Sequence, residues 1–228
     1  MFLNNIFIEH AIIGIDLRTE CNLGDEVVGF KSNDKVFDLH SVISEGIEVQ
    51  PVLDSDEEYL HFLRHDAAHV LAQALTVLFP KIQFGKQFFE GKFIFAFDVY
   101  LPEYNFSSED FPKIENEMRN VIAQEDDIIK HIVEKSKALE RFADDKFKQD
   151  IINHSSCDSV VLYEHGDYID ICHGPRGLNN KYVKYFKLLN VQEVSWLYDE
   201  KIKLQRILGA CFADETSMKQ FLLEKEKN

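Results

Sequence analysis

The chain has 228 residues, of which 45% are hydrophobic and 12% aromatic, so it can bury a substantial core. Its 40 acidic and 25 basic side chains leave a formal net charge of −15, which argues against a protein whose main task is to hold nucleic acid by neutralising phosphates. The apolar start lacks a basic region and is interrupted by Glu9 and Asp16, so it is not read as a signal peptide, and no run of about 18 apolar residues predicts a membrane span.

Residues 1–54 contain short apolar stretches separated by Asn, Gly, Asp and Ser, a pattern typical of strands joined by turns. The stretches cover residues 6–8, 11–15, 27–30, 36–39 and 47–52. We therefore expect a small strand-rich domain over 1–54 and a second domain over 55–228. Ser55, followed three residues later by Glu58, has the form of a capping box and predicts that a long helix begins there.

The second domain alternates helical and strand-like patterns. Apolar residues spaced three and four apart predict a helix from the capping box to Leu78, ended by Pro80. The pattern then predicts, in order, a hairpin over 84–100, a helix after 107–110, a strand over 128–133, a short helix over 137–143, hairpins over 160–172 and 194–208, and a helix over 214–225. The expected fold class is α+β, with the long helix packed against antiparallel sheet.

The four cysteines are far apart in the sequence and form no CxxC pair. This usage fits a reducing cytoplasm better than a disulfide framework. We therefore expect a cytoplasmic protein.

Two histidines in the predicted long helix are candidates for chemistry. His65 and His69 are four residues apart and project from neighbouring turns on one face of the helix, so both can contact one ligand. His61 lies on the same face one turn earlier. The ordinary alternative is a solvated or hydrogen-bonded helix face. The pattern is not the zinc-protease motif HExxH, because Asp66 stands where that motif has Glu.

A second candidate lies in the segment that runs from Asp170 to Arg176. If the strand alternates through Cys172, a carboxylate and a thiol share one face. His173 would then point away from Cys172, which makes it a poor ligand partner. The ordinary alternative is a small buried cysteine beside a turn.

Taken together, seven segments resemble the amino-terminal editing region of bacterial-type threonyl-tRNA synthetases, a region shared in part with alanyl-tRNA synthetases. They are Leu63–Ala74, Ser108–Met118, Phe147-Lys148, Tyr168–Cys172, Phe186–Leu189, Trp196 and Leu204–Gly209. The resemblance runs in order from about residue 55 to the end. Residues 25–54 resemble, in shortened form, the β-grasp-like TGS domain that precedes the editing domain in that family.

The resemblance implies hydrolysis of the ester in serine mischarged on threonine tRNA. A pocket that grips threonine cannot reject serine well, because one missing methyl changes binding by only about 1–3 kcal/mol, so a second, smaller pocket must remove the error. The positions that match the family are His65, His69 and Cys172 as catalytic residues. Asp170 is implied to hold the seryl amino group, and Lys148 to stabilise the developing oxyanion.

One departure from the family concerns the CxxxH element, whose last position is Arg176 here. A guanidinium cannot act as a base, but it could contact phosphate or the terminal adenosine, so Arg176 is a candidate substrate-binding residue. Alanyl-type relatives can bind zinc; here His65, His69 and Cys172 would need a water as fourth ligand. Threonyl-type editing sites are expected to work without metal or other cofactor.

The expected partners are the serine-carrying acceptor end of tRNA(Thr) and the remainder of a synthetase, with no membrane and no DNA. The chain is too short to hold an aminoacylation core beside the editing region, so amino-acid activation is not expected. Two alternatives stay open: an editing fold that has lost catalysis and only supports tRNA docking or folding, and a zinc hydrolase of small molecules. An editing domain needs to grip only the tRNA end, so the charge of −15 remains compatible with an RNA substrate and predicts weak tRNA binding.

Overall fold

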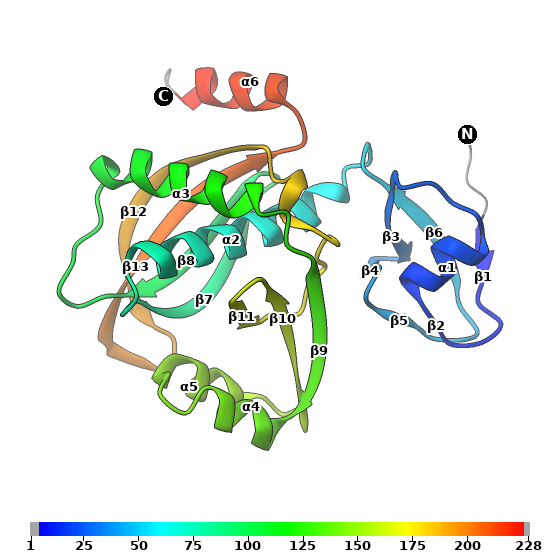
Figure 1. Ribbon diagram of the computed structural model, residues 1–228, viewed down its shortest axis with the longest axis horizontal. Helices are drawn as coiled ribbons and strands as arrows, with labels where there is room; N and C mark the ends of the chain where they lie inside the picture. Colours follow the sequence, from blue (N-terminus) through cyan, green and yellow to red (C-terminus); the bar gives the residue numbers. More distant parts are fainter. Residues whose placement is uncertain (1–4, 226–228) are drawn as a thin grey trace.

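The structure, a computed structural model, describes residues 5–225 and has the expected mixed α+β architecture (Figure 1). The N-terminal unit, residues 5–54, has a four-stranded antiparallel sheet in the order β1-β6-β3-β4 and a two-stranded ladder β2-β5. Its strands are β1 (Ile6–Phe7), β2 (Ile12–Ile13), β3 (Val27–Ser32), β4 (Lys35–Asp38), β5 (Val42–Ile43) and β6 (Glu48–Leu53), and its helix is α1 (Gly14–Glu20).

The remaining residues form two antiparallel sheets and their helices. The larger sheet has the order β12-β13-β8-β7, and the smaller has the order β11-β10-β9. Their strands are β7 (Gln83–Glu90), β8 (Ile94–Tyr100), β9 (Ile128–Glu134), β10 (Ser159–His165), β11 (Tyr168–Ile171), β12 (Tyr185–Trp196) and β13 (Asp199–Phe212). The helices are α2 (Tyr59–Leu78), α3 (Phe111–Ala123), α4 (Lys135–Arg141), α5 (Lys146–His154) and α6 (Glu215–Lys225), with 3-10 turns at Ser108–Asp110 and Asn180–Tyr182.

Helix α2 is the centre of the larger core. It packs against β8 and β13 on one side and against α3 on another, which confirms the expected long helix on antiparallel sheet (Figure 1). From Phe62 to Leu75 every residue except His65 is buried, including Arg64, Asp66, His69 and Gln73. A helix buried nearly all round must satisfy these polar groups inside the protein, so their partners locate the polar interior.

The N-terminal unit has a separate apolar core. Its buried residues are Ile8, Leu17, Val27, Phe30, Phe37, Leu39, Ile43 and Val49, and Leu178 packs against them from the other part of the chain. Figure 1 shows this unit to one side of the two sheets formed by β7–β13. Each of the two parts therefore buries its own apolar residues.

The long helix begins three residues later than the capping box at Ser55 predicts. α2 begins at Tyr59 and its N-cap, Glu58, makes no capping hydrogen bond. The carboxylate of Glu58 instead pairs with Lys31 Nζ at 2.5 Å, and residues 55–58 form turns in which Asp56 accepts a hydrogen bond from the backbone N–H of Leu53. A tertiary ion pair thus replaces the local capping box.

Two helices were missed. The apolar stretch 11–15 forms strand β2 only at Ile12–Ile13, and α1 begins at Gly14. Helix α5 follows an N-cap at Asp145, whose carboxylate accepts hydrogen bonds from the N–H groups of Phe147 and Lys148. The hairpins over 84–100 and 160–172 and the helices after 107–110 and over 214–225 are confirmed. The last hairpin is longer than predicted, because β12 and β13 together extend over Tyr185–Phe212.

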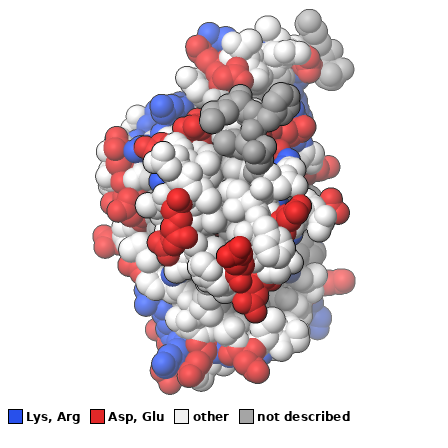
Figure 2. Space-filling model, turned by 90° about the vertical axis from the view of Figure 1, so that its right-hand side faces the viewer, with Lys and Arg blue, Asp and Glu red and all other residues white. Residues whose placement is uncertain are grey.

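The excess of acidic over basic side chains is visible on the surface. Figure 2 shows the face of the N-terminal unit, where acidic side chains are spread over a largely uncharged surface and Lys and Arg lie toward the edges. Across residues 5–225, no helix combines the length and apolar character that crossing a membrane requires.

Leu71→Ala should lower the free energy of unfolding by about 2–5 kcal/mol, because the buried Leu71 side chain would leave a cavity that its neighbours fill only in part. Val77→Ala on the same helix is the control, since Val77 is 58% exposed and its truncation should cost little. Urea unfolding followed by circular dichroism measures both. Equal effects would show that α2 is not the buried centre of the core.

Candidate functional site

A cavity of about 200 Å³ lies where α2, α5, β7, β8 and the end of β11 meet. Its lining residues are His65, Gly85, Lys86, Gln87, Phe89, Phe97, Lys148, Ile151, Asp170, Ile171, Cys172 and His173. Four of the six residues singled out in the sequence are among them: His65, Lys148, Asp170 and Cys172. The other two, His69 and Arg176, lie outside the lining.

His65 is held in one tautomer by its own helix. Its Nδ1 lies 2.8 Å from the carbonyl oxygen of His61, which can only accept, so Nδ1 carries the proton and Nε2 keeps a lone pair. The ring also packs on Phe89, with centroids 4.2 Å apart. Burial lowers the pKa of His65 to about 4. At neutral pH the ring is therefore neutral and can accept a hydrogen bond from water at Nε2.

His69 is fully buried behind the cavity. Its Nε2 lies 2.6 Å from the side-chain amide nitrogen of Gln87, and the same amide's oxygen lies 3.7 Å from Cys172 Sγ. Burial, reinforced by the charge of Arg176, holds the pKa of His69 well below its usual range. Gln87, which lines the cavity, thus connects the neutral His69 to Cys172 and separates that ring from the lining.

Lys148 and Asp170 form a buried ion pair, with Nζ 2.5 Å from Oδ1 and side chains 4% and 0% exposed. Asp170 also accepts hydrogen bonds from the Tyr168 hydroxyl and from the backbone N–H of Ile171. The N-cap that begins α5 places Lys148 in the first turn of that helix, where it meets the end of β11. The charge of each side chain is therefore compensated by the other.

Cys172 is a buried thiol. Burial raises its pKa to about 11, and the backbone N–H of Gly174 lies 3.4 Å from its sulfur. The thiolate is the nucleophilic form of cysteine. At neutral pH Cys172 therefore lines the cavity as a neutral group.

Arg176 is enclosed in the interior and does not reach the cavity. Its Nε lies 2.5 Å from Asp66 Oδ1, its backbone N–H donates to Asp38 Oδ2 at 3.1 Å, and its guanidinium lies 5.6 Å from the Tyr163 ring centre. The residue is 0% exposed. The side chain expected to contact phosphate or adenosine is instead an internal ion-pair partner.

His173 is the residue that sequence reasoning placed on the wrong side. The expectation that it points away from Cys172 needs a strand through both residues, but β11 ends at Ile171. Beyond the strand its alternation no longer applies, and both residues line the cavity. Gln87 and Lys86 were also missed, since a single polar residue in a hairpin strand carries no motif.

The possible zinc ligands are not gathered around one point. Within the described range 5–225, no group of three or more His, Cys, Asp or Glu side chains is arranged to hold a metal ion. His65, His69 and Cys172 thus share a region without forming a metal-binding set.

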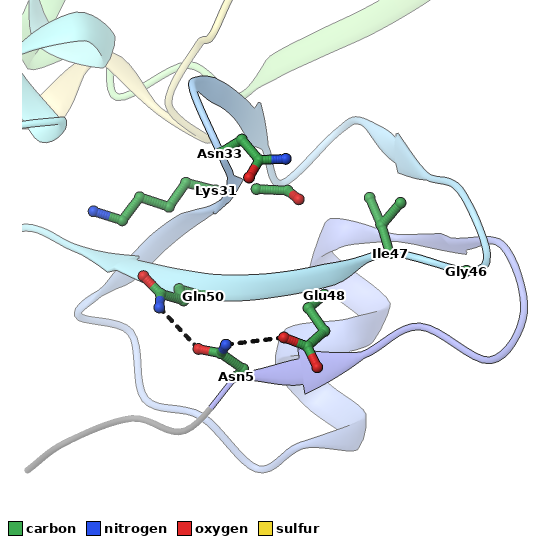
Figure 3. A pocket seen from close by; sticks show the side chains of 8 residues that line it. Asn5, Lys31, Asn33, Gly46, Ile47, Glu48 and Gln50 are labelled. Atoms are coloured by element: carbon green, nitrogen blue, oxygen red, sulfur yellow. Dashed lines mark hydrogen bonds between the residues drawn. The ribbon is translucent and has the colours of Figure 1, made fainter.

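A second hollow, of about 530 Å³, lies on the N-terminal unit (Figure 3). Its polar groups satisfy one another: the amide of Asn5 donates to Glu48, and Gln50 donates to Asn5. Figure 3 shows these three side chains together, Glu48 and Gln50 on β6 and Asn5 just before β1, with Lys31 pointing away from them. The cavity lined by His65 and Asp170 is therefore the stronger candidate for chemistry.

Comparison with known proteins gives one consistent result. No family model matches the sequence. The chain is 35% identical over 203 residues to a threonine--tRNA ligase of Thermoplasma volcanium, covering 89% of this chain and 30% of that protein. It is 35% identical over 210 residues to the one from Staphylococcus carnosus, covering 90% and 32%, and 34% identical over 200 residues to the one from Campylobacter jejuni, covering 86% and 32%. The chain thus spans about a third of the length of the curated relatives it matches.

Lys148→Met should destabilise the protein by about 3–5 kcal/mol at neutral pH, because it leaves the buried carboxylate of Asp170 without its counter-charge. Adding Asp170→Asn to Lys148→Met should recover part of the loss. Lys146→Met, at an exposed position of the same helix, is the control and should be nearly neutral. Urea unfolding of the four proteins checks this, and a Lys148→Met protein as stable as wild type would contradict the buried pair.

Cys172 should react slowly with iodoacetamide in the folded protein. Alkylation requires thiolate, and a pKa of about 11 leaves roughly one part in a thousand ionised at pH 8. Raising the pH from 8 to 10 should speed its labelling about tenfold per unit. Peptide mass spectrometry separates Cys172 from the exposed Cys21 and Cys157, which serve as internal references. Labelling of Cys172 at the rate of Cys157 at pH 8 would contradict the buried, protonated thiol.

Proposed function

Because the chain is homologous to a region of the threonyl-tRNA synthetases, we propose that it hydrolyses the ester of serine mischarged on tRNA(Thr). The family relationship covers about nine-tenths of this chain. The proposed reaction uses water as nucleophile and releases serine and tRNA(Thr).

The observation that carries the proposal is the assembly of one cavity from three distant segments of the chain. His65, Lys148, Asp170 and Cys172 come from α2, α5, β11 and the residue after β11, and all four line the same space. Each matches a position that the family resemblance singles out. Imidazole, ammonium, carboxylate and a neutral thiol together are a suitable set for binding an aminoacyl ester and placing a water beside it.

The water is proposed to bind at His65. Its Nδ1–H donates to the His61 carbonyl, so the ring is fixed and Nε2 is available as an acceptor. The tilted packing of the ring against Phe89 further restricts it. A water hydrogen-bonded to Nε2 would therefore be held in a defined place at the cavity wall, which lowers the entropic cost of its attack.

The ion pair is proposed to bind the substrate's polar atoms. A seryl ammonium would approach Asp170, whose carboxylate already has a fixed orientation from Tyr168 and Ile171. Lys148, paired with Asp170 at 2.5 Å, would place its positive charge beside the ester carbonyl and stabilise the oxyanion. Both groups are buried, so their charges act with little screening by solvent.

The size of the cavity is proposed to determine the preference for serine over threonine. The cavity is about 200 Å³, and Phe89, Phe97 and Ile151 contribute apolar walls. Such walls can exclude the extra methyl of threonine by contact, while a serine side chain is admitted. Editing then removes the smaller amino acid.

Binding of tRNA is proposed to be weak and confined to the acceptor end that carries the amino acid. Several basic side chains near the C-terminus are engaged within the protein: Lys187 lies 3.0 Å from Glu115, and Arg206 lies 2.6 Å from Asp98. The net charge of −15 also disfavours binding along the phosphate backbone. The proposed partners are the serine-carrying end of tRNA(Thr) and the rest of a synthetase that holds its body, in the cytoplasm.

The domain assignment belongs to the same proposal. Residues 1–54 would be the shortened β-grasp-like TGS domain, and residues 55–228 the editing domain. The separate apolar core of the N-terminal unit supports a boundary near 54, where β6 ends and the turns before α2 begin.

The protein should hydrolyse seryl-tRNA(Thr) faster than buffer does and spare threonyl-tRNA(Thr). His65→Ala should slow hydrolysis by about a hundredfold or more, because the water loses its acceptor. His61→Ala is the control: it changes an exposed histidine one turn away and keeps the backbone carbonyl that orients His65. Release of radiolabelled serine measures all three proteins.

Hydrolysis no faster than in buffer would reject the proposal. It would favour the alternative of an editing fold that only supports tRNA docking, for which the burial of Arg176 at the family's histidine position is the supporting feature. Equal loss in His65→Ala and His61→Ala would mean that the histidine at the cavity has no special role.

A further inference from the structure

An exposed imidazole borders the proposed catalytic cavity. His173 lines this cavity beside Cys172, and its side chain has no hydrogen bond, ion pair or ring contact to other residues within 5–225. An imidazole in this state can exchange protons with a bound water. The mechanism described so far leaves it unused.

The loop that carries His173 is anchored on both sides. On one side Cys172 is 4% exposed, and on the other Arg176 is 0% exposed and donates its backbone N–H to Asp38 Oδ2 at 3.1 Å. Between them Gly174 has a φ of +74°, and a Cβ there would lie 2.8 Å from Asp38 Oδ2. Only glycine fits this approach, so the backbone around His173 is held in place.

The other two histidines of the region are poor proton acceptors. The pKa of His65 is lowered to about 4 by burial, which leaves a neutral ring of low basicity. His69 lies behind Gln87, and burial holds its pKa well below its usual range. General-base catalysis at neutral pH is most effective with a group whose pKa is near the working pH. The predicted residues therefore orient water better than they deprotonate it.

We propose that His173 is a catalytic residue of this cavity and accepts the proton of the attacking water; this rests on the proposed seryl-ester hydrolysis. The water oxygen bonds to the ester carbonyl carbon while one water proton moves to the His173 ring. The carbon–oxygen bond to the ribose then breaks, and the same proton passes to the departing ribose oxygen. Serine and tRNA leave, and His173 returns to its neutral form.

The surroundings of His173 are compatible with this cycle. The charged and titratable groups that line the cavity with it are His65 from α2, Lys86 from β7, Lys148 from α5, and Asp170 and Cys172 from the β11 segment. Asp170 and Lys148 compensate each other. Among the described residues that line the cavity, Lys86 has no ion-pair partner and the carboxylate of Asp170 is paired with Lys148, so an imidazolium formed on His173 meets no unpaired lining carboxylate that would hold the proton.

The test compares His173→Gln, His173→Ala and wild type on seryl-tRNA(Thr), with His10→Gln as control because His10 is exposed on the N-terminal unit away from the cavity. His173→Gln should be slower by about 10²–10⁴-fold, and His10→Gln should match wild type. Added imidazole should restore part of the rate to His173→Ala. The pH profile of the rate should differ between wild type and His173→Gln. Thermal melting confirms that all four proteins are folded.

Each result has a definite meaning. If wild type hydrolyses the ester and His173→Gln does so equally fast, the role of His173 is overturned and the proposed function stands. If His173→Gln is slow but keeps the wild-type pH profile and imidazole restores nothing, His173 is not the proton acceptor. If wild type itself is inactive, the proposed function and the role of His173 fall together.

Discussion

The buried guanidinium of Arg176 is the group on which the arrangement of the site depends. Removing a charge from water costs several kcal/mol unless an opposite charge compensates it. Asp66 on α2 supplies that charge, with Oδ1 2.5 Å from Nε. Both Nη atoms lack a hydrogen-bond partner among residues 5–225, so the pair with Asp66 carries most of the compensation. The loop after β11 must therefore stay against α2.

Asp38 extends the same constraint to the N-terminal unit. Its Oδ2 accepts hydrogen bonds from the backbone N–H of Arg176 and from the Tyr163 hydroxyl, at 3.1 and 2.5 Å. Lys130 on β9 lies 3.7 Å from its Oδ1. One carboxylate thus joins β4, β9, β10 and the site loop. The N-terminal unit consequently supports the backbone that presents Cys172 and His173 to the cavity, although it contributes no lining residue itself.

The chemistry of the cavity follows from unequal burial of similar side chains. His69 is fully enclosed, His65 is partly enclosed, and His173 is exposed. Desolvation disfavours imidazolium, so the first two stay neutral at physiological pH. The buried pair of Lys148 and Asp170 keeps its charges only because they lie side by side. Position in the fold, and not residue type, therefore underlies the proposed division of water orientation, proton transfer and ammonium binding among these groups.

The sequence by itself determined the α+β class, the long helix, most hairpins and four of the residues that line the cavity, because helical spacing, turn residues and an ordered set of motifs are local signals. Only the tertiary structure decided where the individual side chains face. Glu58 pairs with Lys31 across the chain and displaces a local cap, and Arg176 turns inward to Asp66. His173 reaches the cavity because β11 ends at Ile171, two residues earlier than alternation through His173 requires. The ion pairs of Glu58 and Arg176 join residues 27 and 110 positions apart, and no local pattern encodes such distant contacts.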